Sequence, residues 1–198
     1  MISNTFPLLF LLVGTGISYG IYSFGNKSLY DERIAIVKQW DLQWGFLSAL
    51  LLSVLVAYLN YYPLRFKGAI MLASSANLRA NQFIYVNAAE GSNKGRVILI
   101  QEGDEGLYNR ANRTLHHFVE NSIHVVLAIG LCSFVFPFPT FVLASMIIVF
   151  RLIYTVSYTN GGYGLHFPGF FAFTFTVNAL NGLLLITAIK AMQSSSDE

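Results

Sequence analysis

The stretch Tyr108–Val126, YNRANRTLHHFVENSIHVV, decides the fold class of this chain. It predicts a helix that enters a membrane with polar side chains along one side. These side chains recur at spacings of three and four residues, which places them on one helical face: Arg110, Arg113, His117, Glu120 and His124. Polar groups are costly inside a bilayer and normally face a helix bundle, a partner or a water-filled site. This face is therefore the strongest indication of function in the sequence.

The composition is that of a small multi-pass membrane protein. Of the 198 residues, 55% are hydrophobic and 11% are charged, whereas a soluble domain carries about a quarter charged residues. The formal net charge of +2 is small and the basic residues are scattered, which argues against nucleic acid as a partner. Cys132 is the single cysteine and lies in an apolar run, so a packed core residue is favoured over a nucleophile.

Five apolar runs are long enough to cross a bilayer at about 1.5 Å per residue. They comprise residues 6–24, 44–62, 108–136, 140–158 and 169–189. No basic segment and no small-x-small cleavage site accompany the first run, so a retained helix is favoured over a cleaved signal peptide. We expect an all-α membrane protein in which an extra N-terminal transmembrane helix precedes a four-helix bundle.

The segments between these runs are polar. Residues 25–43 mix charged and apolar side chains, which predicts a short helix at the membrane interface. In the long loop we expect a short helix at 69–80 and a β-hairpin formed by residues 82–86 and 96–101, with turn residues at 91–95. The chain then divides into residues 1–43, a bundle at 44–192 that includes the loop 64–107, and a polar tail at 193–198.

The positive-inside rule orients these segments. Five crossings place the N-terminus and the loops 64–107 and 159–168 on one side of the membrane. That side carries more basic residues than the other, so the large loop is expected on the cytosolic or matrix face.

A second polar edge lies on the helix predicted at 140–158. It consists of Arg151, Tyr154 and Tyr158, which share one face. The short turn Pro137-Phe138-Pro139 makes this helix antiparallel to the preceding one, so the polar edge and the arginines at 110 and 113 reach the same depth. The excess positive charge fits an anionic ligand held by guanidinium groups. Tyrosine hydroxyls there are placed to donate to a developing thiolate.

Other interpretations of the two polar faces stay open. Arg113, Glu120 and Arg151 can form a buried network that only fixes helix register, and Arg110 can extend to lipid headgroups. A metal site is not expected, because the histidines lack the His-Glu-x-x-His order and the neighbouring arginines repel a cation.

The order of these residues resembles the MAPEG family, the membrane-associated proteins of eicosanoid and glutathione metabolism. The likeness rests on Arg110-Ala111-Asn112-Arg113 with Glu120 seven residues later, an apolar hairpin, and then Arg151-x-x-Tyr154-x-x-x-Tyr158. It covers roughly residues 44–192. The resemblance implies a four-helix bundle that forms trimers and binds glutathione between neighbouring subunits.

The resemblance, together with the residues that lie on or near the two polar faces, predicts roles for individual residues. Residues expected to bind glutathione as co-substrate are Arg110, Arg113, His117, Glu120 and Tyr154. Residues expected to stabilise its thiolate, and so to be catalytic, are Arg151, Tyr158 and His166.

Three positions depart from the family pattern. His117 stands where an asparagine is usual, and Ile123 stands where a proline is usual. The arginine with which the family's synthases activate the thiol, seven to nine residues beyond the last tyrosine, is missing. His166 lies in that window, and a neutral histidine stabilises a thiolate less well than an arginine does.

We therefore expect a membrane-bound glutathione transferase or peroxidase that acts on a hydrophobic electrophile or a lipid peroxide. One alternative is a non-catalytic structural subunit of a larger membrane complex, and the other is a lipid-binding accessory protein. The endoplasmic reticulum is the family's usual membrane and a mitochondrial membrane is the alternative.

Overall fold

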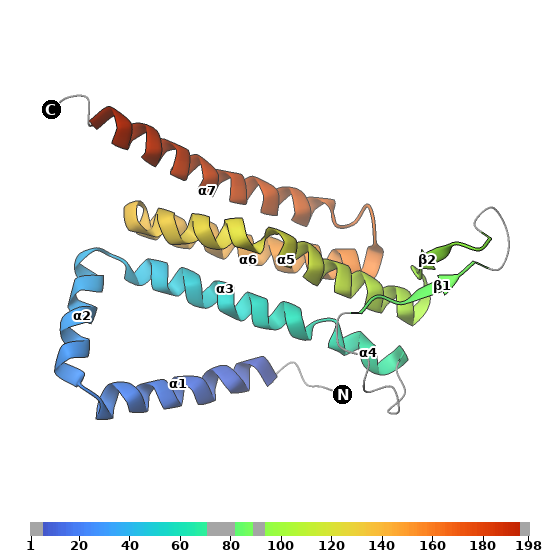
Figure 1. Cartoon of the computed structure of the whole chain (residues 1–198), viewed down its shortest axis with the longest axis horizontal. Coiled ribbons are helices and arrows are strands. Elements are labelled where there is room, and N and C mark those ends of the chain that lie inside the picture. The colour runs from blue at the N-terminus through green and yellow to red at the C-terminus, as the bar shows by residue number, and fades with distance from the viewer. Residues whose placement is uncertain (1–5, 71–81, 89–93, 195–198) are drawn as a thin grey trace.

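The structure, a computed structural model, describes residues 6–70, 82–88 and 94–194. It consists of long helices and one small sheet (Figure 1). In chain order the elements are α1 (Phe6–Phe24), α2 (Lys27–Gln39), α3 (Gln43–Tyr61), α4 (Leu64–Ile70), β1 (Tyr85–Asn87), β2 (Val97–Leu99), α5 (Gly103–Val135), α6 (Pro137–Gly161) and α7 (Phe167–Ser194).

Among the described residues, four helical segments are long and apolar enough to cross a membrane. They are Gln43–Ile70, Gly103–Val135, Pro137–Gly161 and Phe167–Gln193. The apolar helix α1 is added to them at the N-terminal end. The predicted all-α membrane bundle with an extra N-terminal helix is confirmed.

The core of the bundle lies between α3, α5, α6 and α7. Buried apolar side chains from all four helices meet there, including Leu55, Phe118, Ile147 and Leu180. Lipid tails are as apolar as these side chains, so close packing rather than exclusion from water stabilises the contact between membrane helices. At Gly45 of α3 an added Cβ would lie 2.8 Å from the Cβ of Ser133 on α5. The two helices approach this closely only because small residues face each other.

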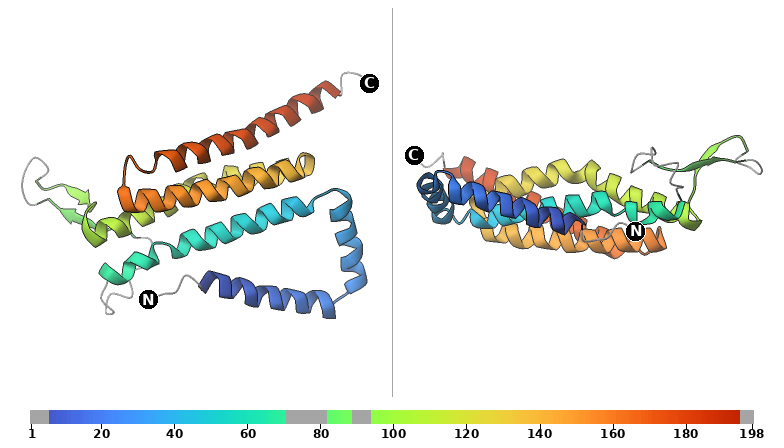
Figure 2. Two further views of the ribbon diagram at one scale, coloured as in Figure 1. Left: turned by 180° about the vertical axis from the view of Figure 1, so that it is seen from behind. Right: turned by 90° about the horizontal axis from the view of Figure 1, so that it is seen from below.

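The N-terminal helices form a U beside the bundle. α1 runs alongside α3, and α2 crosses from one to the other at the end of the bundle (Figures 1 and 2). The corner between α1 and α2 is held by Asp31, which accepts hydrogen bonds from Lys27 Nζ and the Tyr22 hydroxyl, both at 2.5 Å. The Lys27 ammonium holds the pKa of Asp31 below its ordinary value. The short helix expected between residues 25 and 43 is therefore present as α2.

The turn between α5 and α6 is tighter than the sequence indicates. Phe136 is the single residue between the two helices, and its N–H donates to the Cys132 carbonyl at 2.7 Å. The prediction that Pro137-Phe138-Pro139 forms the turn was wrong, because these residues belong to the first turn of α6. Proline is well suited to that place, since the first N–H groups of a helix have no partner within the helix.

The start of α5 also differs from the prediction. The helix begins at Gly103 rather than at the start of the run predicted at 108–136, so Asp104 and Glu105 lie in its first turn. Their carboxylates still favour the positive end of the helix dipole. α5 is thereby extended beyond the apolar region, toward the end of the bundle from which the β-hairpin projects (Figure 1).

The β-hairpin is attached to α5 by asparagine side chains. β1 and β2 are antiparallel, with Val86 opposite Ile98. The buried Asn109 side chain accepts from the Ile84 N–H and donates to the Ile84 and Ile100 carbonyls, each at 2.8 Å. The expected hairpin is present with shorter strands; the turn expected at 91–95 and the helix expected at 69–80 lie mostly outside the described residues.

We expect Asn109→Ala to release the hairpin from α5. The change removes three hydrogen bonds from the partly buried backbone groups of Ile84 and Ile100, which costs about 1–3 kcal/mol. Hydrogen–deuterium exchange should accelerate at residues 82–88 and 94–100, and thermal unfolding in detergent should begin earlier. Asn87→Ala, at an exposed position of β1, is the control. Equal exchange in both variants would show that Asn109 does not hold the hairpin.

Candidate functional site

The predicted site residues gather at one end of the bundle. This end carries the hairpin and the turn between α6 and α7 (Figures 1 and 2). Hydrogen bonds, ring contacts and electrostatic interactions link the residues into a group that we call the polar cluster: Arg110, Arg113, His117, Glu120, Arg151, Tyr154, Tyr158 and His166. The predicted convergence of the two polar faces at one depth is thus what the structure shows. His124 lies exposed two turns beyond His117.

Arg151 is the centre of the polar cluster and is fully buried. Its Nη1 lies 2.9 Å from His117 Nδ1, and its Nη2 donates to the Thr114 carbonyl. The guanidinium carbon is 4.5 Å from the centre of the Tyr154 ring and 5.3 Å from that of Phe118. No carboxylate within the described residues forms a salt bridge with Arg151. Aromatic faces attract a cation but carry no opposite charge, so the interior of the site is positive.

The contact with Arg151 defines the tautomer of His117. Arginine offers only donors, so His117 Nδ1 accepts this hydrogen bond. A neutral His117 then carries its proton on Nε2. The imidazole ring also packs on Tyr154, with 5.4 Å between ring centres. His117 therefore connects the α5 face to the α6 face.

Arg113 and Glu120 form a salt bridge on the outer surface of α5. Arg113 Nη1 lies 2.9 Å from Glu120 Oε1, and the two side chains are 44% and 55% exposed. They do not join Arg151 in a buried network, so that interpretation is wrong. An exposed ion pair contributes little to stability. This pair is available to a ligand or to another protein surface.

Arg110 connects three parts of the chain. Its Nε donates to the Thr159 carbonyl at the end of α6, at 2.7 Å, and its Nη1 donates to the Gln101 carbonyl next to the hairpin. The guanidinium is thus held by protein carbonyls rather than extended to lipid headgroups. Arg110 therefore stabilises the structure of the site, because its guanidinium is already bonded to protein carbonyls and less of it is open to a ligand.

Aromatic rings surround His166 in the turn before α7. Tyr154 and Tyr158 are stacked, with ring centres 5.8 Å apart and planes 8° apart. The His166 ring meets Tyr158 and Tyr163 edge to face at 5.5 and 5.2 Å. Its Nδ1 accepts the Gly164 N–H at 3.3 Å, so a neutral His166 carries its proton on Nε2. Gly164 has a φ of 111°, which a side chain would disfavour.

The sequence did not reveal several contributors to the polar cluster. Phe118 and Phe173 cover Arg151, while Tyr163 and Phe170 pack on His166. Phe170 follows His166 by four residues, a spacing that places the two on one helical face. Tyr163 and His166 lie in the same turn. Phe118 and Phe173 reach Arg151 from different helices, so these contacts have no signature along the chain.

α6 and α7 approach each other closely at Tyr154 and Gly169. A Cβ added at Gly169 would lie 2.6 Å from the Tyr154 backbone nitrogen and 2.8 Å from its Cα. Both atoms belong to the backbone, so a side chain here requires the helices to move apart. Gly169 thereby sets the distance between α7 and the polar cluster.

We expect Gly169→Ala to destabilise the protein by about 1–3 kcal/mol, the usual cost of overpacking. Gly182→Ala is the matched control on the same helix, because an added Cβ there meets nothing within 4 Å and alanine favours a helix. Thermal unfolding in detergent should shift downward for the first variant and stay level or rise for the second. A similar unfolding temperature for both variants would contradict the close approach.

The part of the chain that holds the polar cluster matches a known family. The model of the MAPEG family matches residues 42–189, which include the whole polar cluster and α3, α5 and α6. No curated protein and no solved structure matches the chain.

Proposed function

We propose, because this chain belongs to the MAPEG family, that it binds glutathione at the polar cluster and conjugates it to a hydrophobic electrophile or uses it to reduce a lipid peroxide. The family includes glutathione transferases and related proteins. The chain keeps the cationic face from Arg110 to Glu120 and the opposite edge from Arg151 to Tyr158. The proposal combines this membership with the geometry of the site.

The observation that carries the proposal is the buried charge of Arg151. A buried cation is normally paired with an anion, and Arg151 has no carboxylate partner among the described residues. Glutathione is an anionic peptide with two carboxylates, one amine and one thiol. It would bring negative charge to a positive site.

In this proposal Arg113 and Glu120 hold the ends of the peptide. A guanidinium binds a carboxylate through two parallel hydrogen bonds, and a carboxylate accepts from an ammonium group. Arg113 also lies close enough to interact electrostatically with Tyr154 and Tyr158. We therefore propose that a peptide bound to Arg113 extends toward these tyrosines.

The exposure of Arg113 and Glu120 favours a site between subunits. Both side chains are about half exposed, and charge that is exposed to lipid is costly. A second copy of the chain would cover them and enclose the peptide. We therefore propose a homotrimer, the assembly that the family resemblance implies.

The chemistry requires a stabilised thiolate. The thiol releases its proton to water, the sulfur attacks an electrophilic carbon, an S–C bond forms, and the leaving group departs with its electron pair. Tyr158 and His166 Nε2–H are the donors proposed to face the sulfur. Arg151 lies behind the Tyr154 ring and contributes its positive charge from there.

We expect Arg113→Ala to weaken glutathione binding at least about tenfold, because a hydrogen bond to a charged group contributes about 1.5–3 kcal/mol. Calorimetry and the thermal shift caused by glutathione measure the change in detergent-solubilised protein. Arg96→Ala removes an exposed arginine from the hairpin at the same end of the molecule and should bind normally. Binding that is absent in the unaltered protein, or unchanged in Arg113→Ala, would overturn the proposal.

We expect His166→Arg to raise the rate of conjugation about tenfold or more. A full positive charge near the sulfur favours the thiolate, and a single donor in such a site changes rates by about two orders of magnitude. Turnover of a standard aromatic electrophile is the measurement, with His166→Gln as the variant that lacks a cation. Equal rates in the two variants would show that this position does not face the sulfur.

The second candidate function is a structural subunit of a larger membrane complex. It is favoured by α1, whose apolar side chains are largely exposed and therefore free to contact another membrane protein. Purification in a mild detergent separates the two functions, since a subunit migrates with a large complex and a homotrimer does not. The same preparation reveals retained fatty acids if the chain is a lipid-binding accessory protein. We place the protein in the endoplasmic reticulum, with a mitochondrial membrane as the alternative.

A further inference from the structure

Two apolar grooves lie at the end of the bundle opposite the polar cluster. The first has a volume of about 620 Å³ and lies between α2 and α3, where Ile34, Leu47 and Leu50 line it. The second has a volume of about 430 Å³ and lies between α3 and α5. Both volumes are in the range of ligand-binding pockets, about 300–1,000 Å³. Val37 and Phe46 line both grooves, so the two are neighbours separated by the Phe46 side chain.

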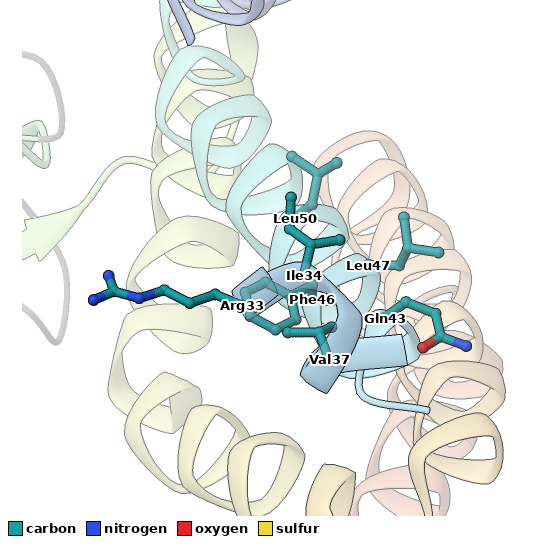
Figure 3. A pocket seen from close by; sticks show the side chains of 7 residues that line it. All are labelled: Arg33, Ile34, Val37, Gln43, Phe46, Leu47 and Leu50. Carbon is teal, nitrogen blue, oxygen red and sulfur yellow. The ribbon is translucent and has the colours of Figure 1, made fainter. Parts of the chain in front are cut away.

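Arg33 is the charged side chain at the edge of the first groove. Figure 3 shows the apolar side chains gathered between α2 and α3, with the Arg33 guanidinium extending away from them. Arg33 is exposed and forms no salt bridge with an acidic residue in the part of the chain that the structure describes. The paired grooves therefore have an apolar interior and a positive entrance.

The position of α2 places this entrance at the membrane surface. α2 crosses the ends of α1 and α3 (Figure 1), and α3 belongs to a segment long enough to span the bilayer. Trp40, at the end of α2, is 64% exposed, and exposed tryptophans are frequent at the level of the headgroups. Phosphates of the lipids lie at this level.

The distance between α1 and α3, where α2 joins them, is too large for the two helices to pack tightly there. This favours lipid as the occupant of the space next to α2. α2 has 13 residues, which makes it about 20 Å long, whereas packed helices lie about 8–10 Å apart. α1 and α3 are thus held apart where α2 joins them. The first groove is lined by residues of α2 and α3, and the second mainly by residues of α3 and α5.

We propose that these grooves bind one anionic phospholipid. Its phosphate contacts Arg33, one acyl chain lies in the groove between α2 and α3, and the other lies beyond Phe46 in the groove between α3 and α5. The charge of Arg33 selects the headgroup, and the two neighbouring grooves match a ligand with two chains. This site is independent of glutathione.

Photo-crosslinking tests the site with the full chain in phosphatidylcholine vesicles. A minor fraction of phosphatidylglycerol carries a diazirine on one acyl chain, and labelled peptides are identified by mass spectrometry. We expect labels in α3 around Phe46–Leu50 and in α5 around 126–134. Arg33→Ala should reduce both labels about fivefold, the effect of one basic residue at an anionic membrane surface.

Three controls make the result decisive. Lys38→Ala removes the same charge from α2 at a position outside both grooves and should leave labelling unchanged. Ala49→Phe fills the second groove and should remove the α5 label alone. A phosphatidylcholine probe should give weak labelling, and Arg33→Ala should not change its yield. Equal labelling by both lipids, no effect of Arg33→Ala, or a co-purified protein crosslinked in the grooves would overturn the proposal.

Discussion

The buried guanidinium of Arg151 is the constraint on which the site depends. Its charge is held between α5 and α6 by a carbonyl, an imidazole nitrogen and aromatic faces, none of which is an anion. The Thr114 carbonyl can accept this bond in addition to its bond within the helix, because a carbonyl has two lone pairs. The orientation of His117 and the packing of Tyr154 both follow from the place of this one side chain.

The outer residues of the site are arranged by the N-terminal part of α5, which extends beyond the apolar region of the helix. Asn109 and Arg110 hold the hairpin and the end of α6 to this helix. Both side chains bond to backbone carbonyls, which fixes the loops without using the charges of Arg113 and Glu120. Those two charges remain at the surface. Polar groups that hold the structure and polar groups that stay available to a ligand are therefore found within about three turns of one helix.

The helices and the convergence of the two polar faces could be predicted from the sequence. Helical periodicity and the length of an apolar run depend only on residues close together in the chain. The sequence was insufficient where contacts join separate helices. Nothing in the sequence indicates that His117 pairs with Arg151, or that Arg113 and Glu120 face outward. The assignment of Pro137 to a turn failed because proline is equally compatible with the first turn of a helix.

The distribution of charge argues for binding more strongly than for catalysis. A cation buried behind an aromatic ring attracts an anion at every stage of a reaction, whereas catalysis requires interactions that strengthen in the transition state. Arg151 lies behind the Tyr154 ring, so its charge would attract an anion at every stage. Tyr158 and His166 are less buried than Arg151 and lie nearer the outer surface of the cluster. In the proposed reaction they are the donors that can contact the sulfur, while Arg151 contributes its charge from behind the Tyr154 ring. The proposed attraction of an anion and the proposed chemistry are thus separated by depth.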